Sequence, residues 1–288
     1  MPERDGYIAG VPCWVDTSQP DPDAAAQFYG DLFGWEFDEA MPAGSQGRYL
    51  IARLRGGDVA AVSSLPDGAP TQAVWNTYIW VGDADETAAK AREAGGAILS
   101  EPFDVMDAGR AAVIADPEGA VFCIWQAKEH RGARIVNEPG SLTFNVLNTR
   151  DPGAAKPFYR AVFGWTTLDL GSGEFWTLQA YGDYLEELTP GTRERTAEFG
   201  AAGFEDVVAA IRLIGADEVE APAHWGVTFS TEDADETAAK AAAIGGAVLV
   251  APVDAPYSRL TVLRDPQGAM FSATAFVPEN KDVGRAAA

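Results

Sequence analysis

Cysteine and histidine are both scarce in this chain of 288 residues. The two cysteines, Cys13 and Cys123, lie far apart, and the two histidines are His130 and His224. Two distant cysteines in a chain of this size do not make a disulfide framework, so both are expected as free thiols. The lack of histidine also leaves little material for a metal site built on imidazole ligands.

Positive charge is also in short supply. The chain has 21 Lys and Arg against 43 Asp and Glu, which gives a formal net charge of −22. A surface this negative repels phosphate backbones and anionic lipids, so nucleic acid and membrane are not expected as partners. The charge either serves solubility alone or lines an acidic cleft that attracts cationic molecules.

Long apolar runs are missing as well. No stretch approaches the roughly 20 residues that a helix needs to cross a bilayer. The first residues show no apolar segment behind a basic one, so no standard signal peptide is visible. We therefore expect a soluble, cytoplasmic protein.

The chain does contain an internal repeat. Four blocks recur in the same order: 21–35 with 151–165, 83–90 with 233–240, 95–96 with 245–246, and 116–120 with 265–269. Such self-similarity is typical of a duplicated fold. It predicts a domain at 8–127, a polar linker at 128–140, a second domain at 141–277 and a tail at 278–288.

The second half is the longer one. The spacing between the blocks increases there, which predicts an insertion at about 190–220. Within it, residues 204–214 have a mostly apolar helical pattern. The expected helix either extends the core or forms the lid or wall of a ligand cleft.

The pattern of each half predicts the order strand, helix and three strands, and this order occurs twice. The Asp-Pro-Asp at 21–23 predicts a helix over 21–33, and Gly95-Gly96 ends a second helix over 83–94. Short runs rich in aromatic and β-branched residues predict strands at 11–17, 49–54, 59–63, 75–81, 111–114 and 121–126. Each half is thus predicted to contain two βαβββ units.

This order of motifs, with Phe28-Tyr29, Phe33-Gly34-Trp35 and the Asp116-Pro turn, resembles the vicinal oxygen chelate superfamily. That superfamily includes glyoxalase I, bleomycin-resistance proteins and extradiol dioxygenases. The resemblance covers nearly the whole chain, once per half, as in tandem bacterial members. It implies an α+β fold whose mixed sheets curl around a cavity. It also implies a monomer, because one chain supplies the pair of domains that single-domain relatives form as dimers.

The resemblance further implies three metal-ligand positions in each half. By the family's spacing they are Trp14, Asn76 and Cys123 in the first half, and Phe144, Gly226 and Ser272 in the second. Neither set supplies the imidazole and carboxylate groups that hold a divalent ion. We therefore expect no metal cofactor, with a divalent metal as the alternative.

Four residues are candidates for acid or base chemistry. Glu186 matches a fourth-strand position where glyoxalase I keeps a carboxylate, and His224 lies two residues before Gly226, on the same strand face. Together they are an acid–base pair, two metal ligands, or simply a strand-edge histidine and a surface glutamate. Asp16 and Tyr257 are the other two candidates.

The resemblance also implies which strand face lines each cavity, and in that register alternating positions give the lining residues. They are Trp14, Asn76, Tyr78, Trp80, Cys123 and Trp125 in the first half, and Phe144, Gly226, Thr228 and Ser272 in the second. The aromatic set either packs as core or holds a planar, partly apolar ligand. The small Gly226 and Ser272 leave room for a larger ligand. With no histidine expected beside it, Cys123 is predicted to be a packed thiol.

Two arginines, Arg110 and Arg259, occupy matching places before the seventh strand of each half. They are either structural or ligands for an anionic group.

Two functions are consistent with these features. The first is a metal-independent protein that binds a small, partly aromatic antibiotic or metabolite. The second is an enzyme, either a glyoxalase-like lyase or isomerase or a hydroxylase-labelled tailoring enzyme.

Overall fold

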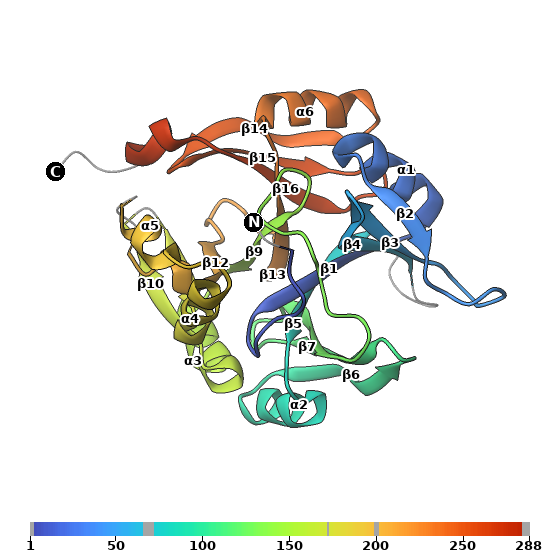
Figure 1. Ribbon diagram of the computed structural model, residues 1–288, viewed down its shortest axis with the longest axis horizontal. Helices are drawn as coiled ribbons and strands as arrows, with labels where there is room; N and C mark the ends of the chain where they lie inside the picture. Colours follow the sequence, from blue (N-terminus) through green and yellow to red (C-terminus); the bar gives the residue numbers. More distant parts are fainter. Residues whose placement is uncertain (1–2, 66–71, 172, 199–201, 284–288) are drawn as a thin grey trace.

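The computed structural model describes residues 3–65, 72–171, 173–198 and 202–283. Its described part contains two eight-stranded sheets and six α-helices (Figure 1). The first half consists of β1 (Pro12–Gln19), α1 (Pro22–Phe33), β2 (Glu36–Glu39), β3 (Tyr49–Leu54), β4 (Gly57–Ser64), β5 (Val74–Trp80), α2 (Ala84–Glu93), β6 (Ala97–Val105), β7 (Gly109–Ala115) and β8 (Val121–Ala127).

The second half repeats this order with two additional helices. It consists of β9 (Leu142–Thr149), α3 (Pro152–Phe163), β10 (Thr166–Asp169), β11 (Glu174–Thr177), α4 (Gln179–Leu188), α5 (Thr192–Glu198), the short 3-10 helix η1 (Phe204–Asp206), β12 (Val207–Leu213), β13 (His224–Ser230), α6 (Ala234–Ala243), β14 (Ala247–Ala255), β15 (Ser258–Arg264), β16 (Met270–Phe276) and η2 (Pro278–Asp282).

Both sheets have the same mixed topology. The strand orders are β2-β3-β4-β1-β5-β8-β7-β6 and β10-β11-β12-β9-β13-β16-β15-β14. The central strands β1 and β5 pair antiparallel, whereas each pairs in parallel with the last strand of its own unit. The α+β class and the two βαβββ units per half are therefore confirmed, and neither sheet closes into a barrel.

The repeated motifs form the helix ends that the sequence predicts. Asp21 caps α1 by accepting a hydrogen bond from the Ala24 amide, and Asp151 does the same for α3. Both helices end where a glycine, Gly34 or Gly164, takes up positive φ, a conformation that side chains with a Cβ disfavour.

The insertion differs from its prediction. Residues 204–214 form η1 and the strand β12, and the additional helices α4 and α5 precede them. The helix predicted at 204–214 was wrong because β12 pairs with both β11 and β9, and this tertiary pairing overrides an ambiguous apolar pattern. The extra chain between β11 and β12 takes the place of the tight Arg55-Gly56 turn between β3 and β4.

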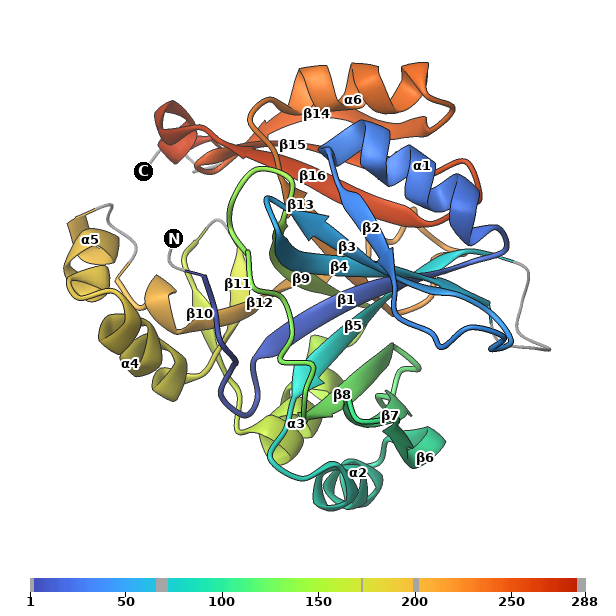
Figure 2. The same cartoon turned by 45° about the vertical axis from the view of Figure 1, so that its right-hand side comes forward.

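The two halves interlock through their helices. Helix α1 lies beside α6 of the second half, and α3 lies beside α2 of the first, in both views (Figures 1 and 2). The hydroxyl of Tyr29 donates to Asp265 at 2.9 Å, and that of Tyr159 donates to Asp116 at 3.0 Å. The Phe-Tyr motif of each half thus binds the Asp-Pro turn of the other.

Within the described residues, no helix is both long enough and apolar enough to cross a membrane.

Candidate functional site

Each sheet carries the predicted cavity-lining residues on one face, which we call the first and second inner faces. In the first sheet, Trp14 lies opposite Tyr78, Asp16 lies opposite Asn76, and Tyr78 lies beside Cys123. In the second sheet, Thr228 lies opposite Phe144 and beside Ser272, while Gly226 lies opposite Val146. Strand pairing thus brings together the residues that alternation predicted.

A buried carboxylate occupies the centre of the first inner face. Asp16 is only 2% exposed and accepts three hydrogen bonds. The hydroxyls of Tyr78 and Tyr49 donate to Oδ2 at 2.8 and 3.1 Å, and the amide nitrogen of Asn76 donates to Oδ1 at 2.8 Å. Burial raises the pKa of Asp16, and the three hydrogen bonds oppose that rise. Sequence reasoning missed Tyr49, which comes from the separate strand β3.

His130 joins this face from the linker. Its ring packs edge-on against Trp14 at a centroid distance of 4.4 Å, and its carbonyl accepts the indole N–H of Trp125 at 2.9 Å. Its Nε2 is buried without a hydrogen-bond partner. Burial lowers the pKa of His130, which favours the neutral ring. The sequence placed His130 in the linker and carried no signal that the linker returns to this face.

The remaining residues of the first inner face are packed. Trp14, Cys123 and Trp125 are buried, and burial raises the pKa of the Cys123 thiol. This agrees with the expected packed thiol, because the thiolate is the nucleophilic form. Trp80 packs against Tyr7 at 6.1 Å between ring centroids, so the N-terminal segment covers it.

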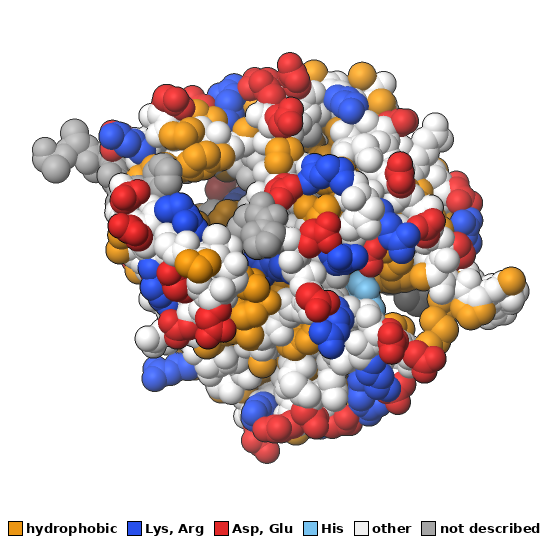
Figure 3. Space-filling model, viewed as in Figure 1, with side chains coloured by type: hydrophobic (Ala, Val, Ile, Leu, Met, Phe, Trp, Pro, Cys, Tyr) orange, Lys and Arg blue, Asp and Glu red, His pale blue; other side chains and the backbone are white. Residues whose placement is uncertain are grey.

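The second inner face is more open. Phe144, Phe175 and Phe204 form an aromatic cluster with centroid distances of 6.5, 6.1 and 5.5 Å, and all three rings are partly exposed. Gly226 and Ser272 are also partly exposed. Figure 3 shows a hollow on this half, between the side that carries α5 and the side that carries β14 and β15. Phe175 and Phe204 were not predicted; Phe204 follows the additional helices, which the repeat could not align.

Several polar side chains lie together on the second inner face, where β13 begins. His224 lies opposite Asn148, and its Nδ1 contacts the carbonyl of Pro222 at 2.9 Å. A carbonyl only accepts, so Nδ1 carries the proton and Nε2 is the acceptor in the neutral ring. The guanidinium of Arg212 donates to Asn148 at 3.2 Å and pairs with Glu218 at 2.7 Å.

Glu186 does not lie on a fourth strand, so its predicted place beside His224 was wrong. It belongs to α4 and accepts the backbone N–H groups of Gly191 and Arg193 at 2.7 and 3.0 Å. These bonds tie α4 to the start of α5 and lower the pKa of Glu186. The fourth strand is β12, where Ala210 lies opposite Val146.

Tyr257 lies in the turn between β14 and β15 and has a φ of 56°. Its carbonyl accepts the backbone N–H of Val277 at 2.8 Å. This hydrogen bond joins the residue that follows β16 to the turn.

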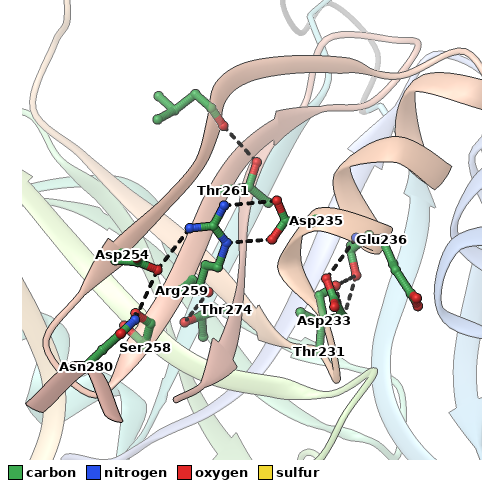
Figure 4. Close-up of polar contacts among 12 residues, drawn as sticks. Thr231, Asp233, Asp235, Glu236, Asp254, Ser258, Arg259, Thr261, Thr274 and Asn280 are labelled. Atoms are coloured by element: carbon green, nitrogen blue, oxygen red, sulfur yellow. Dashed lines mark hydrogen bonds and ion pairs between the residues drawn. The ribbon is translucent and has the colours of Figure 1, made fainter. Parts of the chain in front are cut away.

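Arg259 is part of an ion-pair network (Figure 4). It pairs with Asp235 at the start of α6 and with Asp254 on β14, and Arg110 repeats the pattern with Asp85 and Asp104. Each arginine thus joins a helix start to two strands. This geometry favours the structural alternative over binding of an anionic ligand.

The six metal-ligand positions do not fit a divalent ion. Trp14 is a donor only, and Phe144 and Gly226 have no side-chain ligand atom. The first half keeps only the amide of Asn76 and the thiol of Cys123, whose raised pKa disfavours the metal-binding thiolate, and the second half keeps only the hydroxyl of Ser272. Across the residues that the structure describes, no three His, Cys, Asp or Glu side chains form a potential metal cluster.

Comparison with known proteins gives consistent matches over both halves. A model of the Glyoxalase/Bleomycin resistance protein/Dioxygenase superfamily matches residues 14–124 and 129–272. The protein named "Putative glyoxylase CFP32" of Mycobacterium tuberculosis is 40% identical over 284 residues, covering 97% of this chain and 100% of that protein. The "Anthracycline biosynthesis protein DauV" of a Streptomyces species is 34% identical over 279 residues, covering 92% of this chain and 93% of that protein.

Solved structures show the same architecture. The Mn(II)-bound glyoxalase from Novosphingobium aromaticivorans matches with a TM-score of 0.59 and 16% identity, over 93% of this chain and 83% of that chain. The dioxygenase LapB from Pseudomonas matches with a TM-score of 0.58 and 12% identity, over 93% of both chains. At these identities the likeness concerns the fold alone.

Proposed function

Because this chain belongs to the glyoxalase/bleomycin resistance protein/dioxygenase superfamily, we propose that it is a metal-independent protein that captures a small, partly aromatic molecule. We place the main site on the second inner face. One observation carries this proposal: three phenylalanine rings there are partly exposed and converge beside small residues.

The side chains of this face are suited to a flat ligand. The rings of Phe144, Phe175 and Phe204 offer apolar surface for stacking. Ser272 is partly exposed and adds a hydroxyl group, which can orient an oxygen atom of a ligand without supplying a charge, while Thr228 beside it is buried. Gly226 leaves the centre of the face free of a side chain.

The named relatives point to the same ligand class. Two Streptomyces relatives, at 34 and 33% identity, are named as anthracycline biosynthesis proteins, and anthracyclines are flat, polycyclic aromatic molecules. The net charge of −22 is compatible with the amino sugar that makes such molecules cationic. Metal independence is supported by donor sets that lack imidazole and carboxylate at the six family positions. We further propose that the protein is a monomer, because one chain already supplies both halves. We also propose a cytoplasmic location.

A binding titration tests this function. We expect dihydroxyanthraquinone, a planar aromatic probe, to bind the wild-type protein saturably and to bind Phe144→Ala and Phe204→Ala about tenfold more weakly, because stacking rings contribute about 0.5–1.5 kcal/mol beyond the area they bury. The measurement is quenching of probe fluorescence. Phe103→Ala on β6 is the matched control, since Phe103 is 44% exposed and lies in the first half.

Two outcomes would contradict the proposal. Equal affinity in all three variants would place the ligand elsewhere. Stoichiometric Zn, Ni, Fe or Mn in the purified protein, with loss of binding on chelation, would overturn metal independence.

The second candidate is a glyoxalase-like lyase or isomerase, or a tailoring enzyme. His224 favours it, because the contact of Nδ1 with a carbonyl leaves Nε2 as a possible base at the end of the second inner face. Mass spectrometry of the probe after incubation separates the two functions: an unchanged mass supports capture, and a new mass supports catalysis.

A further inference from the structure

We propose that the first inner face is a separate site for a protonated amine, with Asp16 as the opposite charge behind a layer of hydrogen-bond acceptors. This inference does not depend on the function proposed for the second inner face.

The carboxylate of Asp16 is held by neutral groups. Its three hydrogen-bond donors, from Tyr49, Tyr78 and Asn76, are all neutral. No ion pair to Asp16 occurs among the described residues. A buried carboxylate without an opposite charge is costly, and a cationic ligand offsets that cost.

The hydrogen-bonding groups around Asp16 favour a ligand that donates hydrogen bonds. Both tyrosine hydroxyls donate their hydrogens to Asp16. The indole N–H of Trp14 donates to the hydroxyl of Tyr49 at 3.0 Å. The amide nitrogen of Asn76 donates to Asp16 and to Ser18. What these groups leave for a ligand is the carbonyl oxygen of Asn76 and a lone pair of Tyr78, whose hydroxyl also contacts the Cys123 thiol.

Aromatic rings complete the site. Tyr78 packs edge-on against Trp125 at 6.3 Å between centroids, and Tyr49 lies on the opposite side of Asp16. Tyr49, Asn76 and Tyr78 are partly exposed, while Asp16 behind them is sealed from solvent. An ammonium group that donates to these acceptors would lie beside the aromatic rings of Tyr49 and Tyr78, and aromatic rings attract cations.

The second half provides an internal comparison. The strand register places Val146, Gly226 and Thr228 where the first half has Asp16, Asn76 and Tyr78. None of these three positions of the second inner face therefore carries a carboxylate, an amide or a phenol. The amine site is therefore expected on the first inner face alone.

Calorimetric titration with benzylamine, and with benzyl alcohol as its neutral counterpart, tests the proposal. We expect the wild-type protein to bind benzylamine saturably and more tightly than benzyl alcohol. Asp16→Asn should weaken benzylamine binding at least about tenfold, because it removes the negative charge that attracts the ammonium group in poorly solvated surroundings. Asp31→Asn, at an exposed position of α1, removes the same charge from the same half and should bind like the wild type.

A second variant keeps the test decisive if Asp16→Asn fails to fold. Tyr78→Phe retains the ring and removes the hydroxyl that accepts from the ligand, so it should weaken benzylamine binding more than benzyl alcohol binding, because the bond from an ammonium group is the stronger one. Phe144→Ala, which alters the second inner face, should leave benzylamine binding unchanged and separates the two proposals. Absence of saturable benzylamine binding, equal affinity for amine and alcohol, or wild-type affinity in folded Asp16→Asn would each overturn the inference.

Discussion

At the scale of single residues, two tyrosine hydroxyls connect the halves of the molecule. Tyr159 donates to Asp116 of the other half and accepts the indole N–H of Trp225 at 2.9 Å. Tyr29 makes the equivalent contacts with Asp265 and Trp75. All of these groups are buried, so each hydroxyl satisfies two partners that water cannot reach.

We expect Tyr159→Phe to lower the free energy of unfolding by about 1–3 kcal/mol, because it leaves Asp116 and Trp225 with unmade hydrogen bonds. Urea denaturation measures the change. Tyr184→Phe is the control: Tyr184 is only partly buried and its hydroxyl makes one bond, to the carbonyl of Gly6, so the loss should be smaller. An equal loss in both variants would show that the hydroxyl of Tyr159 has no special role.

At the scale of elements, a glycine allows each helix that carries the Phe-Tyr motif to pack closely against the other half. A Cβ on Gly96 would lie 2.8 Å from the ring of Phe158 on α3 and 2.9 Å from the carbonyl of Ala115. Gly246 stands in the same relation to Phe28 on α1, at 3.1 Å. The second glycine of each Gly-Gly pair therefore does more than end a helix: it lets the aromatic ring of the other half approach closely.

Gly96→Ala should lower the free energy of unfolding by about 1–3 kcal/mol, the usual effect of inserting atoms into a packed site. Gly82→Ala is the matched control, because a Cβ there meets nothing within 4 Å. It should change stability by no more than about 0.5 kcal/mol. Thermal unfolding of both variants checks the difference, and a larger loss in Gly82→Ala would contradict the packing argument.

At the scale of the whole molecule, the two halves pack against each other through equivalent elements and carry different side chains on their inner faces. The repeated blocks meet across the halves: α1 packs on the second half and α3 on the first. Meanwhile the first inner face holds a carboxylate cluster, and the second holds an open aromatic cluster.

Separate fragments, residues 1–137 and 138–288, are therefore expected not to unfold cooperatively when each is alone, because each would expose the apolar surface that the other covers. Mixing or co-expression should restore the cooperative transition. Circular dichroism during heating, with size-exclusion chromatography, measures both. A single fragment that stays monomeric and melts like the whole protein would show that the halves are independent.

Local sequence determined much of the fold. The strand predicted at 49–54 is β3, and the helices predicted at 21–33 and 83–94 are α1 and α2 within one residue at each end. Caps, glycine stops and alternating apolar residues act over a few positions, so they can be read without the rest of the chain. The same alternation placed Phe144, Gly226, Thr228 and Ser272 on one face.

The site depended more on tertiary structure. Tyr49 and His130 reach Asp16 and Trp14 from a separate strand and from the linker, and Phe204 reaches Phe144 from beyond the insertion. Glu186 was misplaced because the repeat was aligned through chain that has no counterpart in the first half.

The sequence by itself determined that the chain is duplicated, acidic and poor in histidine and cysteine. Only the tertiary structure decided which distant side chains meet, because those contacts follow from strand pairing and from the path of the linker. Neither of these is encoded in a local pattern.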